Sequence, residues 1–136
     1  MYFLSMKKIK LACIIEDNPA NIFWMEEIIE EVGFCEELLI FYNGKEALDG
    51  LNEIISKDDK LPGVIFLDLN MPVMDGWEFL DEFTKKPPAS TPIIIYIVTS
   101  SINPADLIKA RNYELVTNYI VKPVTVERLK EILHEI

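Results

Sequence analysis

The sequence predicts an α/β fold, a doubly wound five-stranded parallel sheet with five helices. Short, nearly continuous apolar runs alternate along the chain with longer segments in which apolar residues recur every three or four positions. The chain has 136 residues, of which 50% are hydrophobic and 26% are charged. That length and composition allow one globular domain with a substantial core.

The strands are expected where the apolar runs are short and almost uninterrupted. Such runs are typical of parallel strands, because helices cover both faces of the sheet and neither face is polar. The expected strands are residues 9–15, 38–42, 64–67, 93–98 and 118–121.

Helices are expected between the strands and after the last one. Residues 19–32, 45–56 and 125–136 each place their apolar residues on one stripe. The third helix is expected to start after Asp75 and the fourth at Asn103-Pro104. The proline-rich stretch 85–92 between them is expected to be a surface loop.

Start signals support these helices. Asn18 and Asn103 each precede a proline, and Asn followed by Pro is a common way to begin a helix. Two further pairs have the spacing of a capping box, with Asn or Asp in the first position. These pairs are Asn43 with Glu46 and Asp75 with Glu78.

Charge and composition exclude several classes of protein. Thirteen basic against 23 acidic residues give a net charge of −10, which disfavours direct binding of nucleic acid. Two cysteines do not make a disulfide framework or a zinc site. The longest apolar runs are far shorter than the ~20 residues that span a bilayer. We therefore expect a cytoplasmic protein without membrane insertion.

The domain is expected at residues 7–136, preceded by an extension at 1–6 that is native or a remnant of cloning.

Polar side chains follow four of the five expected strands. Glu16 and Asp17 follow the first, Asp68 ends the third, Thr99 follows the fourth and Lys122 follows the fifth. The carboxyl ends of parallel strands share one edge of a sheet, so these groups are expected to converge there if the strand order brings the first, third, fourth and fifth strands together. Clustered carboxylates repel one another unless a cation intervenes, and oxygen ligands without His or Cys favour Mg²⁺.

Together these residues resemble the receiver domain of two-component response regulators, and in particular the single-domain chemotaxis regulator. The resemblance runs from about residue 7 to residue 136 with all motifs in order. Its motifs are Glu16-Asp17, IFLDLNMPVMDG at 65–76, Val98-Thr99-Ser100 and Tyr119-Ile120-Val121-Lys122-Pro123. The resemblance implies a flavodoxin-like fold of the receiver type.

The resemblance also implies a role for each residue of the expected site. Asp68 would accept a phosphoryl group from a phosphohistidine donor and form an aspartyl phosphate. Asp17 and Asp68 would bind Mg²⁺ directly, Glu16 directly or through water, and Asn70 through its backbone carbonyl. Lys122 would pair with Asp68 and then with a phosphoryl oxygen. Glu16 stands where many members of the family carry Asp.

Two residues are implied as a switch. Thr99 would turn toward the phosphoryl group, and the rotamer of Tyr119 would follow. The output surface would be formed by the fourth helix, fifth strand and fifth helix. Four residues are expected to shape the loops around the site without taking part in the chemistry: Pro72, Asp75, Gly76 and Pro123.

The implied partners are a histidine kinase or a histidine phosphotransfer protein, and a downstream protein that the sequence does not identify. The chain would be a monomer or a dimer that depends on phosphorylation. It would catalyse its own phosphorylation and dephosphorylation without being an enzyme in the sense of turnover. Asn70 is expected to tune access of the hydrolytic water.

Three other functions share the fold or the strand-end Asp. A phosphohydrolase of the haloacid dehalogenase kind needs a second Asp two residues after the first, where this chain has Asn70. A flavin-binding protein needs a Ser/Thr/Gly-rich phosphate loop after the first strand, where this chain has the acidic pair. A receiver that binds partners without phosphorylation remains a third alternative.

Overall fold

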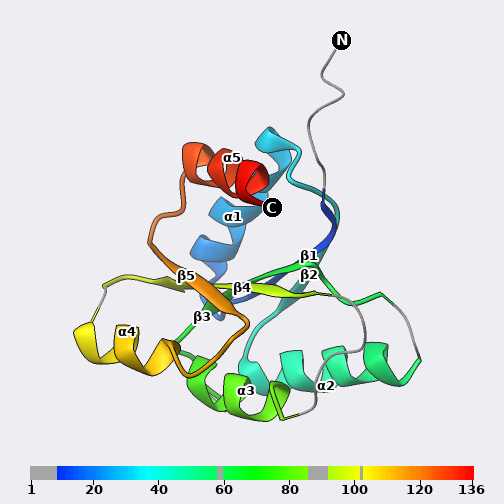
Figure 1. The fold of residues 1–136 in the computed structure, drawn as a ribbon. Coiled ribbons are helices and arrows are strands. Elements are labelled where there is room, and N and C mark those ends of the chain that lie inside the picture. The colour runs from blue at the N-terminus through cyan, green and yellow to red at the C-terminus, as the bar shows by residue number, and fades with distance from the viewer. Residues whose placement is uncertain (1–8, 58–59, 86–91, 102) are drawn as a thin grey trace.

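A single parallel sheet, with strand order β2-β1-β3-β4-β5, organises the chain in a computed structural model (Figure 1). The structure describes residues 9–57, 60–85, 92–101 and 103–136, so the expected extension at 1–6 and most of the 85–92 loop lie outside the described residues. Within the described residues, the five strands are β1 (Ile9–Ile15), β2 (Cys35–Phe41), β3 (Val64–Asp68), β4 (Ile94–Thr99) and β5 (Val116–Val121). The described helices are α1 (Pro19–Val32), α2 (Gly44–Ser56), α3 (Gly76–Phe83), α4 (Pro104–Ala110) and α5 (Val126–Glu135). The predicted fold class is confirmed.

The helices cover the sheet on both sides. Figure 1 shows α1 and α5 on one face, and α2, α3 and α4 on the other. Successive strand residues point to opposite faces, so Ile14 of β1 packs with the α1 and α5 side chains while Ile15 packs with those of α2 and α3. Both faces are apolar, which is why the strands read as continuous apolar runs in the sequence.

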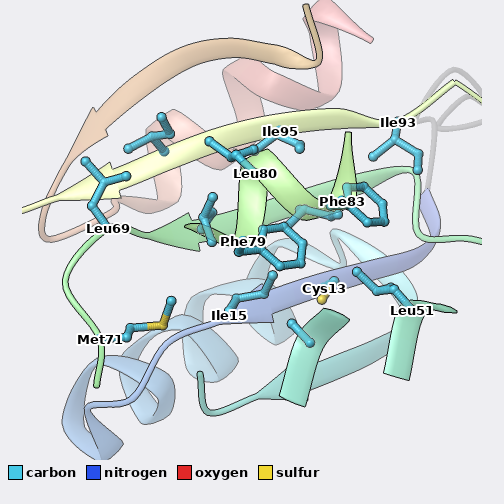
Figure 2. Close-up of a cluster of buried hydrophobic side chains, with 14 of the residues drawn as sticks. Cys13, Ile15, Leu51, Leu69, Met71, Phe79, Leu80, Phe83, Ile93 and Ile95 are labelled. Carbon is cyan, nitrogen blue, oxygen red and sulfur yellow. The ribbon is translucent and has the colours of Figure 1, made fainter. Parts of the chain in front are cut away.

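The core beneath α2 and α3 is densely filled (Figure 2). Phe79 and Phe83 of α3 stack with their ring centroids 5.2 Å apart, and Leu51 of α2 is fully buried. Cys13 of β1 is also fully buried there, and burial raises the pKa of its thiol far above the ordinary value. Cys13 is therefore an unreactive packing residue.

The two edge strands begin earlier than the sequence predicted. β2 begins at Cys35 instead of residue 38, and β5 begins at Val116 instead of residue 118. Each of these strands pairs with one neighbour only, so its outer residues meet solvent and can be polar. Glu36 and Glu37 are exposed in β2. Because both are charged, the start of this strand is not part of an apolar run in the sequence.

The helix starts follow the predicted caps. The Asp75 side chain accepts from Glu78 N while Glu78 Oε1 accepts from Asp75 N, which completes a capping box. At Asn43 only half of the box forms, because Glu46 Oε1 accepts from Tyr42 N instead of from the cap residue. In the part of the chain that the structure describes, no helix has the length and apolar character needed to cross a membrane.

Candidate functional site

The candidate site lies at the carboxyl edge of the sheet, where β1 and β3 are neighbours. β2 lies on one side of β1, whereas β3, β4 and β5 lie on the other side. The strand order therefore reverses between β1 and β3, and ligands of such sheets bind at this point. Asp68 lies beside Val98, and Thr99 lies beside Val121, which places the ends of β3, β4 and β5 in one row.

Three carboxylates converge at this edge. Glu16, Asp17 and Asp68 each offer an oxygen, and these oxygens all lie within 4.8 Å of one another. Glu16 and Asp68 are each only 5% exposed, whereas Asp17 is closer to solvent. The backbone of Glu16 is bonded to the end of β2, since Glu16 N donates to the carbonyl oxygen of Phe41 at 3.0 Å.

Lys122 places its ammonium group among these carboxylates. Its Nζ lies 2.7 Å from Glu16 Oε1 and 3.5 Å from Asp68 Oδ1. The resemblance implied that Lys122 pairs with Asp68; this ion pair is present, and a shorter one joins Lys122 to Glu16. Glutamate has one more methylene than aspartate, and this length brings its carboxylate to the ammonium group. The peptide bond between Lys122 and Pro123 is cis.

The electrostatics of the cluster favour an added cation. Burial, together with the negative charge of Glu16, raises the pKa of Asp68 from 3.8 to about 6. Lys122 and the Asn70 N–H, which donates to Asp68 Oδ1 at 3.3 Å, oppose this shift without cancelling it. A positive ion beside Asp68 would stabilise its charged form.

The donor set fits a hard divalent cation. The cluster offers only carboxylate oxygens, and no described His or Cys lies in it. The Asn70 amide is directed at Asp68, so the backbone of Asn70 lies beside the cluster. Glu16, Asp17 and Asp68 are the side chains that could hold Mg²⁺, and the Asn70 carbonyl stays a ligand expected from the resemblance.

Thr99 and Tyr119 both take part in hydrogen bonds away from the carboxylates. The buried Thr99 hydroxyl donates to the carbonyl oxygen of Ser101 at 2.9 Å, in the loop that leads to α4. The Tyr119 hydroxyl donates to the carbonyl oxygen of Asp106 in the first turn of α4. Both residues of the expected switch are thus bonded to α4 or to the loop before it.

The loop from β3 to α3 is packed closely against the end of β3. A Cβ on Gly76 would lie 2.6 Å from the backbone oxygen of Asp68, so this position excludes any side chain. Gly44 is equally restricted, because a Cβ there would lie 2.7 Å from the backbone oxygen of Met74. Val73, which follows Pro72 in this loop, is exposed to solvent. Its φ of 72° is a left-handed conformation that β-branched residues rarely adopt.

Sequence reasoning missed three contributors to the site. Trp24 Nε1 of α1 donates to the Val124 carbonyl oxygen at 2.6 Å, across a separation of 100 residues. Asn18 N donates to Glu16 Oε2 at 3.2 Å, and Gly44 N donates to the carbonyl oxygen of Met74 at 3.0 Å. No spacing or motif connects Trp24 with Val124, so this contact is visible only in three dimensions.

Comparison with known proteins gives a consistent result. The family model described as response regulator receiver domain matches residues 12–134. The probable methanogenesis regulatory protein FilR2 of Methanothrix harundinacea is 32% identical over 123 residues, which cover 90% of this chain and 78% of FilR2.

Solved structures agree. A two component response regulator from Cytophaga hutchinsonii superposes with a TM-score of 0.84 at 31% identity, covering 95% of this chain and 96% of that one. Response regulator Rcp1 of Synechocystis is 31% identical over 115 residues, covering 83% of this chain and 76% of Rcp1. The solved Mn²⁺-bound form of Rcp1 has a TM-score of 0.72 at 27% identity, covering 93% of this chain and 90% of that one.

Proposed function

The chain belongs to the response regulator receiver domain family, and on this basis we propose that it is a phosphoacceptor switch. Asp68 accepts a phosphoryl group from the phosphohistidine of a histidine kinase or a histidine phosphotransfer protein. A carboxylate oxygen of Asp68 forms the new bond to phosphorus, the phosphorus–nitrogen bond of the donor breaks, and the donor imidazole keeps the electron pair.

Asp68 must be ionised to act as the nucleophile. Its raised pKa leaves it partly protonated near neutral pH, so the site needs positive charge beside it. Asp17 and Asp68, with Glu16 and the Asn70 carbonyl nearby, would hold Mg²⁺ for this purpose. When bound, Mg²⁺ supplies charge that stabilises the phosphoryl oxygens in the transition state.

Lys122 supplies the second positive charge. Its ammonium group lies 3.5 Å from the Asp68 oxygen, and it is only partly exposed to solvent. A phosphoryl group on Asp68 would carry oxygens within reach of this ammonium group. A fixed charge in a site with little water stabilises those oxygens more than a mobile counterion would.

The proposed output is a change at the surface of α4, β5 and α5. A phosphoryl group on Asp68 offers Thr99 a charged acceptor in place of the Ser101 carbonyl oxygen. Release of the Ser101 carbonyl would free the loop before α4, whose first turn is bonded to Tyr119. Leu107, Ile108 and Val121 are already exposed on this surface, where a protein partner would bind.

One observation carries the proposal most directly. Asp68, at the end of a buried central strand, is 5% exposed and is flanked by two carboxylates and one ammonium group. A merely structural Asp in such a place would be paired by enough hydrogen bonds to lower its pKa, and here the pKa is raised.

Intact mass after incubation with acetyl phosphate tests the proposal. The wild-type chain is expected to gain one phosphoryl group in Mg²⁺ and none with a chelator, and Asp68→Asn to gain none. Asp75→Asn is the matched control, because asparagine also caps a helix and Asp75 lies in the same loop. If no adduct formed under any condition, including with a phosphorylated histidine protein as donor, the chain would be a receiver that binds partners without phosphorylation.

A further inference from the structure

Both carboxylate oxygens of Glu16 already have protein partners. Oε1 pairs with Lys122 Nζ at 2.7 Å, and Oε2 accepts from Asn18 N, at the N-cap of α1, at 3.2 Å. The side chain is 6% exposed, so water competes little for either oxygen. Glu16 therefore joins the start of α1 to the end of β5.

A second contact holds the same two segments together. Trp24 of α1 donates to the carbonyl oxygen of Val124, two residues after Lys122. The segment that carries Lys122 is thus held at its backbone by Trp24 of α1 and at its side chain by Glu16, which lies just before the N-cap of α1. This double attachment fixes where the ammonium group of Lys122 lies.

The ammonium group lies closer to Glu16 than to the phosphoacceptor. Its distances are 2.7 Å to Glu16 Oε1 and 3.5 Å to Asp68 Oδ1. A direct ion pair at 2.7–2.9 Å is the stronger of the two contacts. Glu16 thus keeps Lys122 beside Asp68 but out of close contact with it.

We propose that Glu16 is a positioning residue for Lys122, and that it acts on the metal through Lys122 instead of as a direct ligand. This inference rests on the proposed function and specifies the role of Glu16 in the same site. Holding the ammonium group on Glu16 leaves the Asp68 oxygens available to Mg²⁺ and to phosphorus. Without the Glu16 carboxylate, the nearest partner of Lys122 is Asp68, and a close pair there would compete with the divalent cation.

A double-mutant cycle on Mg²⁺ affinity tests the proposal. The variants are Glu16→Gln, Lys122→Met and their combination, and isothermal titration with MgCl₂ measures the dissociation constant of each. Glu16→Gln is expected to weaken Mg²⁺ binding roughly tenfold when Lys122 is present, and by less than about threefold in the Lys122→Met background. Glu27→Gln, on the exposed face of α1, is the control and is expected to leave the affinity unchanged.

Two outcomes would overturn the proposal. Equal losses in both backgrounds would mean that Glu16 binds the metal directly. No loss in either background would mean that Glu16 does not influence the site. If the wild-type chain bound no Mg²⁺ and accepted no phosphoryl group, the proposed function itself would fail.

The ion pair is tested separately in the metal-free wild-type protein. The Lys122 ammonium group is expected to give a slowly exchanging ¹⁵N signal, assigned by its loss in Lys122→Met, with a hydrogen-bond correlation to the Glu16 carboxylate. A correlation to Asp68 instead, or rapid exchange with water, would contradict the positioning role, and either result is read in the wild-type protein itself.

Discussion

Asp68 makes the stability of the metal-free protein depend on pH. Its folded-state pKa of about 6 lies above the ordinary 3.8, so between these values the folded state holds a proton that the unfolded state releases. The free energy of unfolding therefore falls as pH rises through this window and stays lower above it. Asp68→Asn removes this loss, and after allowance for solvent screening we expect it to stabilise the metal-free protein by about 1 kcal/mol near pH 7.5.

Urea denaturation in chelator measures this effect. The difference between Asp68→Asn and the wild type is expected to shrink at about pH 5, where the folded wild type retains most of its proton. Asp75→Asn is the control, since asparagine can also cap the helix and Asp75 lies outside the carboxylate cluster. A difference that grew as pH fell would contradict the raised pKa.

Val73 is the second residue whose replacement we expect to stabilise the protein. Its φ of 72° places a β-branched side chain in a left-handed conformation, and 79% of the residue is exposed, so little packing is lost on removing it. We expect Val73→Gly to raise the free energy of unfolding by about 1 kcal/mol. Val73→Ala keeps the Cβ and is expected to gain less, and a loss of stability in both variants would mean that the side chain makes a necessary contact.

At the scale of the elements, the loop between β3 and α3 depends on close backbone approach. A Cβ on Gly76 would lie 2.6 Å from the oxygen of Asp68 and 2.9 Å from Leu69 Cα, both backbone atoms that cannot rotate away. We expect Gly76→Ala to lower the free energy of unfolding by about 2 kcal/mol or more, measured by urea denaturation. Gly63→Ala is the matched control, because a Cβ there meets nothing nearer than 3.8 Å, and its effect should stay within about 0.5 kcal/mol.

Helix α4 has only seven residues and relies on side chains from other elements. Tyr119 of β5 donates to the carbonyl of Asp106 in its first turn, and Lys109 in its last turn lies over the Trp77 ring of α3, 4.7 Å from the centroid. We expect Tyr119→Phe to cost about 1 kcal/mol and to speed amide hydrogen exchange in α4. Tyr42→Phe, at an exposed tyrosine, should do neither, and unchanged exchange in Tyr119→Phe would show that α4 does not need this bond.

The elements were predictable where burial and capping act locally. β1 and α1 begin and end where the sequence placed them, because Ile9–Ile15 is apolar apart from Lys10 and Asn18 caps a helix that starts with proline. The start of β2 was not predictable, since Glu36 and Glu37 are polar residues on an edge strand and belong to the sheet through backbone pairing alone. Local sequence does not show which edge residues find such a partner.

At the scale of the whole molecule, the convergence of the site follows from topology. The sequence placed Glu16, Asp68 and Lys122 at one edge of a parallel sheet, and the strand order β2-β1-β3-β4-β5 makes the strands that carry them near neighbours. The sequence does not show which carboxylate lies closer to the Lys122 ammonium group. That depends on the length of each side chain, and the two nitrogen–oxygen distances differ by less than 1 Å. The Trp24 contact with Val124 was equally hidden, since it depends on how α1 packs beside the loop after β5.

The net charge of −10 also acts on the whole molecule, and it makes the effect of Mg²⁺ on stability a test of specific binding. Any salt screens the general repulsion, but only an ion bound in the folded state adds stability that grows with the logarithm of its concentration. We expect Mg²⁺ at ten times its dissociation constant to raise the free energy of unfolding by about 1.4 kcal/mol beyond NaCl of equal ionic strength. Asp17→Asn should lose this increment while Asp75→Asn keeps it, because only Asp17 belongs to the carboxylate cluster. Equal increments in both variants, measured by denaturation, would mean that Mg²⁺ acts on the acidic surface as a whole and that the cluster binds no ion.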